Sequence, residues 1–221
     1  MDRTISVKGI GSISAKPDCV CLSLSITEKA LEYEKAAENA ARRIRLLQGA
    51  VRQAGFAAGD LKTAGFLVDT VYESASNQGG NYRRLFAGYS CVHRLKLEFA
   101  LDSRRLAGVL AAIAGCGASP ELNISFTVKD PDKAREELLA SAAGNARAKA
   151  EALCRASGVR MGQLLRIDYG WDELDIVSPT LYRLEAGAVA PMAAADRTVP
   201  EIEPEDIRLR ETARFVWKLS E

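Results

Sequence analysis

The sequence lacks a long apolar run, a strong charge imbalance and, with the exception of one residue, histidine. No apolar run approaches the roughly 18 residues that a membrane-spanning helix needs, so we expect no membrane span. The net charge is +1, because 30 Lys and Arg residues are balanced by 29 Asp and Glu residues. This balance argues against nucleic acid or an anionic membrane as a partner. The first residues show no signal-peptide pattern. As written, the chain is expected to be cytoplasmic, or periplasmic or at the cell surface if a leader has been removed.

The five cysteines form no disulfide framework, because their number is odd and their spacing irregular. Cys19 and Cys21 are two residues apart on a predicted strand and therefore share one face. A zinc site would need two further ligands, and Cys91 with His93 is the one pair available. That pair lies in register with core residues, whereas Cys19 and Cys21 do not, so the two pairs are expected on opposite faces. We therefore interpret Cys19 and Cys21 as small, half-buried strand residues.

No catalytic motif is present in the sequence. His93 lies on an apolar register, which is typical of a core histidine with a hydrogen bond, and no nucleophile motif adjoins it. The Gly9-Ile10-Gly11 step lacks the third glycine of a dinucleotide fingerprint and lies inside a strand. We therefore expect no catalytic residue, no metal and no cofactor.

Hydrophobic periodicity predicts an α+β fold with element order ββαββ-αβαββ, in which antiparallel or mixed sheets pack with long helices. The predicted helices span residues 30–54, 102–115 and 130–156. The predicted strands span residues 4–14, 19–27, 61–73, 85–101, 121–128, 163–171 and 206–220. The polar stretch between the third and fourth strands is expected to form an exposed hairpin loop.

A single domain over residues 1–221 is expected, with two related βαβ-type lobes at approximately 1–101 and 102–221. The stretch 178–205 contains four prolines and much alanine, which predicts a long loop.

Three local features carry specific expectations. Gly9 and Gly11 occupy the apolar register of the first strand, which indicates either a bulge or close approach by a neighbouring element. Glu211 interrupts the apolar face of the last strand, which predicts a bulge or an edge position. The arginines of the first helix follow three glutamates and are interpreted as a solvated face: Arg42, Arg43 and Arg45.

Four stretches, taken in order, resemble the SIMPL-domain family: ISVKGIGSISAKPD, LKTAGF, AGYSCVHRLKLEF and the segment NISFTVKDPDKAREELLASAAGNARAKAEALCRASGVRMGQLLRI. The resemblance covers about residues 4–219. Two departures stand out. Ile10 replaces the acidic residue usual between the two glycines, and Cys19 and Cys21 stand where the family has small or apolar residues.

The resemblance implies an α+β fold, no established enzymatic activity and no cofactor. It also implies self-association, because some members form large ring- or channel-like oligomers, and a link to oxidative stress in bacterial members. Our leading hypothesis is a non-enzymatic homo-oligomer that acts through protein contacts in stress protection. The alternative is a thiol-dependent redox or metal-binding protein that uses Cys19 and Cys21. A hydrolase whose residues converge from separate strands is a third possibility.

Overall fold

The computed structural model describes residues 3–76, 82–170, 175–180, 182–184 and 203–220. These residues form two compact units, each built from segments far apart in the sequence. The first unit comprises residues 1–18, 127–179 and 204–221, and the second comprises residues 19–126 and 180–203. Among the described residues, no helix combines the length and the apolar character required to cross a membrane.

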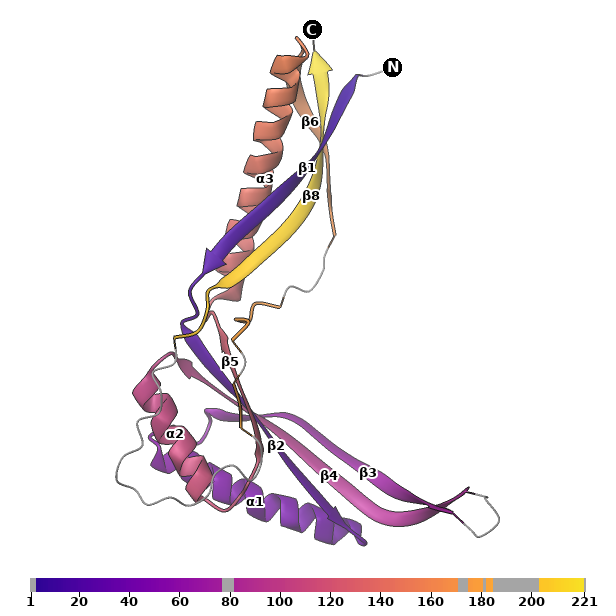
Figure 1. Ribbon diagram of the computed structural model, residues 1–221, viewed down its shortest axis with the longest axis vertical. Helices are drawn as coiled ribbons and strands as arrows, with labels where there is room; N and C mark the ends of the chain where they lie inside the picture. The colour runs from indigo at the N-terminus through magenta and orange to yellow at the C-terminus, as the bar shows by residue number, and fades with distance from the viewer. Residues whose placement is uncertain (1–2, 77–81, 171–174, 181, 185–202, 221) are drawn as a thin grey trace. The chain divides into compact units, whose positions relative to one another are not determined.

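The first unit is a three-stranded antiparallel sheet covered by one long helix (Figure 1). The last strand of the chain, β8 (Ile207–Ser220), lies between β1 (Thr4–Ala15) and β6 (Arg160–Tyr169). The helix, α3 (Pro131–Ala156), begins where the Asp130 carboxylate accepts a hydrogen bond from the Lys133 amide at 3.0 Å. Such a cap satisfies an amide that has no partner within the helix.

Helix α3 lies very close to β1 because both contribute small residues to the contact. A Cβ added to Gly9 or Gly11 would overlap the backbone oxygens of Ala142 and Leu138, respectively. Small residues recur along the buried stripe of the helix: Ala134, Ala142, Ala146 and Ala150. The expected close approach at Gly9 and Gly11 is confirmed, and the β1–β8 pairing shows no bulge there.

Helix α3 also covers the open edge of β1. The Asn145 side-chain oxygen accepts a hydrogen bond from the Ile10 amide at 3.0 Å, and the Lys149 ammonium donates to the Lys8 carbonyl at 3.2 Å. An uncovered edge strand offers unpaired backbone groups to other chains. The polar residues of α3 therefore protect this edge from non-specific strand pairing.

The second unit is a five-stranded sheet with two helices against one face (Figure 1). Its strand order is β3-β4-β2-β5-β7. The strands are β2 (Cys19–Ala30), β3 (Leu61–Ser76), β4 (Tyr82–Ala100), β5 (Glu121–Thr127) and β7 (Tyr182–Leu184), and the helices are α1 (Tyr33–Gln53) and α2 (Ser103–Gly115). The core consists of alternate residues of β2, β4 and β5 and the apolar stripes of both helices, and includes Leu22, Leu47, Leu97, Val109 and Phe126.

The α+β class and the element order are confirmed, with β7 as an additional strand. β7 falls within the loop predicted at 178–205, most of which lies outside the described residues. The lobe boundary expected near residue 101 falls inside the second unit, and the single-domain organisation stays a prediction.

Two local expectations need correction. Glu211 lies opposite Gly11 in an unbroken register, so the bulge alternative is wrong. Among the described residues the β6 pairing ends at Ala213, so Glu211 is paired on the β1 side alone, as the edge alternative expects. Arg43 is not part of a solvated face. Its guanidinium donates to the Ala118 and Ser119 carbonyls at 2.8 and 2.9 Å and pairs with Glu28. Arg43 thus joins α1 to the loop before β5.

Candidate functional site

Cys19 and Cys21 are more buried than the sequence indicated. Only 9% and 6% of their surfaces are exposed. The strand position expected for them is therefore confirmed, but the expected half-burial is wrong, because both side chains are buried. Cys21 lies opposite Glu98 in the β2–β4 pairing, and its face also carries the ion pair between Lys96 and Glu98 at 2.7 Å. The hydrogen bond to Glu98 raises the pKa of Lys96. Buried thiols react slowly because reagents cannot reach them.

Cys91 and His93 lie on the opposite face from Cys19 and Cys21, as expected from their registers. Burial, followed by the nearby Glu28 carboxylate, raises the pKa of the Cys91 thiol, and burial lowers the pKa of His93. The His93 Nε2 atom is 3.0 Å from the Thr63 hydroxyl, so the expected hydrogen bond is present. The side chain itself is half-buried, so His93 lies at the margin of the core and not inside it. The described part of the chain holds no group of three or more side chains placed to bind a metal.

The β3–β4 hairpin exposes several large apolar side chains in the second unit. The hairpin extends beyond the N-terminal start of α1, so the helix leaves part of one hairpin face uncovered (Figure 1). Five large apolar side chains of the hairpin are close to half exposed or more: Phe66, Leu67, Tyr72, Leu85 and Phe86. Leu67 and Leu85 lie on the opposite face of the hairpin from their neighbours Phe66 and Phe86, because successive strand residues alternate between faces. Exposed apolar residues that occur singly are ordinary, but a contiguous group marks an interaction surface.

Four aromatic rings form a continuous row on this hairpin and the adjacent start of α1. We call Tyr33, Tyr89, Phe86 and Tyr72 the aromatic row. Successive ring centroids are 6.1, 5.4 and 6.0 Å apart, and each pair meets edge to face. Tyr72 and Phe86 are cross-strand partners with 46% and 50% of their surfaces exposed. The Arg84 guanidinium lies 4.8 Å from the Tyr72 ring centre and extends the row by a cation–π contact.

The free edge of β3 is less suited to binding than the aromatic row. The β3–β4 pairing shifts register twice, between Thr63 and Gly65 and between Val71 and Tyr72. Irregular pairing and charged side chains, here including Lys62 and Asp69, discourage the addition of another strand to an edge. Contact through the exposed side chains is therefore favoured over backbone pairing.

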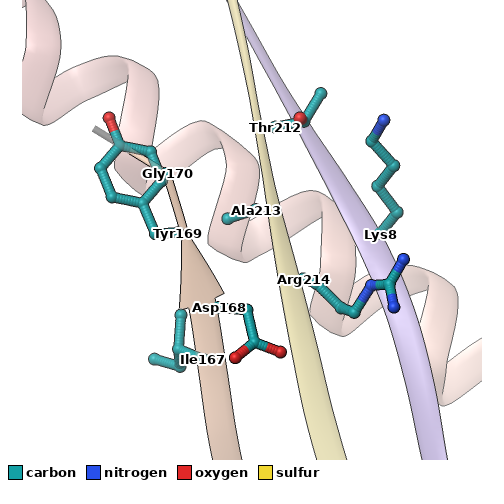
Figure 2. Close-up of a pocket in the computed structure, with 8 residues that line it drawn as sticks. All are labelled: Lys8, Ile167, Asp168, Tyr169, Gly170, Thr212, Ala213 and Arg214. Atoms are coloured by element: carbon teal, nitrogen blue, oxygen red, sulfur yellow. The ribbon is translucent and has the colours of Figure 1, made fainter. Parts of the chain in front are cut away.

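A second, polar feature lies on the first unit, on the sheet face away from α3. An open hollow of about 540 Å3 is lined by residues of all three strands, including Lys8 of β1, Asp168 of β6 and Arg214 of β8 (Figure 2). Asp168 is held by Arg166, whose guanidinium lies 3.0 Å from the carboxylate. The hollow therefore presents cationic side chains next to the hydroxyl of Thr212.

The pattern of the whole chain matches one protein family, whose description is SIMPL, protein of unknown function, over residues 5–217. The chain belongs to the SIMPL family. This SIMPL protein is also similar to the 26 kDa periplasmic immunogenic proteins of Brucella melitensis and Brucella abortus, at 26% identity over 163 residues in each case. The match covers 74% of this chain and 65% of each Brucella protein, slightly less than two thirds of their length.

The aromatic row was not predicted from the sequence. Tyr89 lies four residues before His93 on the predicted strand 85–101 and so shares its apolar face, but alternation alone cannot tell whether a helix covers that face. Tyr72 lies at the end of the predicted third strand, and Phe86 at the start of the fourth. The closeness of aromatic residues on both sides of one hairpin loop was the available signal.

Proposed function

We propose that this SIMPL protein is a non-enzymatic interaction protein that self-associates, and that the aromatic row of the β3–β4 hairpin forms the contact. The observation that carries the proposal is the row itself, in which Tyr72 and Phe86 meet edge to face yet are about half exposed. Tyrosine and other aromatic side chains are enriched among the residues that dominate binding energy in protein interfaces.

A second copy of the chain is the partner that fits this surface best. In a symmetric dimer contact the same patch is used on both partners, so it must be complementary to itself. Aromatic rings meet this requirement because the edge of one ring packs against the face of another without a charged partner. The resemblance to a family with oligomeric members points the same way.

The thiol alternative has less support. A redox or metal-binding role for Cys19 and Cys21 requires accessible thiols of low pKa. Both thiols are buried, and Glu98, the cross-strand partner of Cys21, pairs with Lys96. A role in oxidative stress stays a prediction. The periplasmic name of the two Brucella proteins supports a periplasmic location for this chain, whereas the cytoplasmic location stays a prediction from the sequence.

The test compares sedimentation of the wild-type protein with that of the double variant Tyr72→Ser/Phe86→Ser. A matched control is Leu139→Ser/Leu153→Ser, which removes two exposed apolar side chains from α3 in the other unit. We expect the wild type and the control to sediment as assemblies and the hairpin variant to sediment as a smaller species. An unchanged assembly in the hairpin variant, with its circular dichroism intact, would show that the contact lies elsewhere.

A further inference from the structure

The face of the β1–β8–β6 sheet that points away from α3 is basic. Alternate residues of β8 are buried toward the helix, including Leu209, Ala213 and Phe215, so the residues between them lie on the other face. We call this surface the basic face; it carries Arg208, Arg210, Arg214 and Lys218 of β8, Lys8 of β1 and Arg166 of β6. The net charge of the whole chain is only +1, so this local concentration of positive charge cannot be read from the composition.

The centre of the basic face holds two like charges directly opposite each other. Lys8 is the cross-strand partner of Arg214 on one side, and Asp168 is its partner on the other side. Asp168 is already bound by Arg166 at 3.0 Å. In Figure 2 the Arg214 guanidinium lies on the β1 side of its strand and the Asp168 carboxylate on the other. Like charges that face each other across strands destabilise a sheet, which makes this arrangement costly unless an anion lies between them.

The surroundings of the pair suit an oxyanion. The hollow of about 540 Å3 is lined by Lys8, Arg214 and Thr212, and also by Asp168, whose negative charge is offset by its ion pair with Arg166. Small hydroxyl residues face the other arginines, since Ser12 lies opposite Arg210 and Ser14 opposite Arg208. The Ser14 hydroxyl donates to the Asp206 carboxylate at 3.1 Å, so at that end of the face the arginine is the group that would contact an anion. Arginine, lysine and hydroxyl side chains are the groups that most often bind phosphate oxygens.

The basic face is elongated, which favours a linear ligand over a single ion. Ten residues separate Arg208 from Lys218, a distance of about 34 Å along an antiparallel strand. The outward residues of β1 and β8 are charged, hydroxyl or aliphatic, and offer no aromatic rings on which bases could stack. We propose that the basic face binds a linear polyanion of phosphate groups without bases, with Lys8 and Arg214 at the centre of the site.

The experiment measures binding of long-chain inorganic polyphosphate to the full chain as a function of salt. The test variant is Lys8→Gln/Arg214→Gln, and the charge-preserving variant is Lys8→Arg/Arg214→Lys. The matched control is Arg135→Gln/Arg147→Gln, which removes two exposed arginines of α3 that already have acidic partners. Circular dichroism of each variant verifies that it is folded.

We expect the test variant to bind polyphosphate roughly tenfold more weakly than the wild type. The slope of log affinity against log salt should also become less steep, by about 1.4. The control and the charge-preserving variant should bind like the wild type. An equal loss in the control, or no loss in the test variant, would overturn the proposal. So would equal affinity for inorganic phosphate at the same phosphate concentration, or binding only to single-stranded DNA or to anionic lipid vesicles.

Discussion

Gly9→Ala tests the packing between β1 and α3 most sharply. The added Cβ would overlap the Ala142 carbonyl oxygen and lie 2.8 Å from the Ala146 Cβ, so the helix itself must move. Overpacking of this kind costs about 1–3 kcal/mol, and helix movement would also weaken the Ile10–Asn145 hydrogen bond, worth about 1 kcal/mol. Alanine restricts the unfolded chain more than glycine does, and this offsets about 0.5–1 kcal/mol of the loss in stability. The expected net loss is about 2 kcal/mol, roughly a thirtyfold change in the folding equilibrium.

Urea unfolding followed by tryptophan fluorescence measures this loss, because Trp217 is buried in the same unit. Gly144→Ala is the matched control. Gly144 lies on α3 itself, and an added Cβ there meets no atom within 4 Å. We expect the control to stabilise the protein by about 0.5–1 kcal/mol. If Gly9→Ala also stabilised the protein, or changed its stability by less than about 0.5 kcal/mol, the close contact would be refuted.

Four further outcomes are expected. Lys8→Thr should raise the free energy of unfolding by about 0.2–1 kcal/mol at low salt by removing the like-charge pair with Arg214; a loss of stability in urea would contradict this. Arg43→Lys should cost about 1–3 kcal/mol in the same assay, because lysine cannot reproduce the donors to two carbonyls and a carboxylate. Native thiol labelling read by mass spectrometry should modify Cys116 first, since the other cysteines are buried; earlier labelling of another cysteine would contradict it. Burial lowers the pKa of His93, so its contribution to stability is present above the unfolded value of 6.5 and is lost as pH falls through the folded pKa. His93→Gln should therefore reduce the fall in melting temperature with falling pH, measured in melts at several pH values.

Much of the fold could be predicted from local patterns, because alternation and helical periodicity reflect burial within each element. The predicted third strand ends at residue 73, whereas pairing with β4 continues through Ser74 and Ser76, which carry no apolar signal. Strand length in such a hairpin is set by backbone hydrogen bonds to the partner strand, which composition does not reveal.

Long-range contacts account for the remaining differences. The burial of Cys21 depends on how the sheet is covered, and the role of Arg43 depends on a loop 75 residues further along the chain. The basic face was visible in the alternation of the last strand. The pairing of Lys8 with Arg214 at its centre could not be predicted, because it depends on the register between β1 and β8, which are far apart in the sequence.

The mass of the wild-type protein in solution tests self-association most directly. Light scattering after size exclusion, at micromolar concentration with and without reductant, separates an assembly from the 23.9 kDa chain. We expect a multiple of that mass that is unchanged by reductant, because the contact is aromatic and Cys19 and Cys21 are buried. A mass of 23.9 kDa in both conditions, or an assembly that dissociates in reductant, would contradict the account.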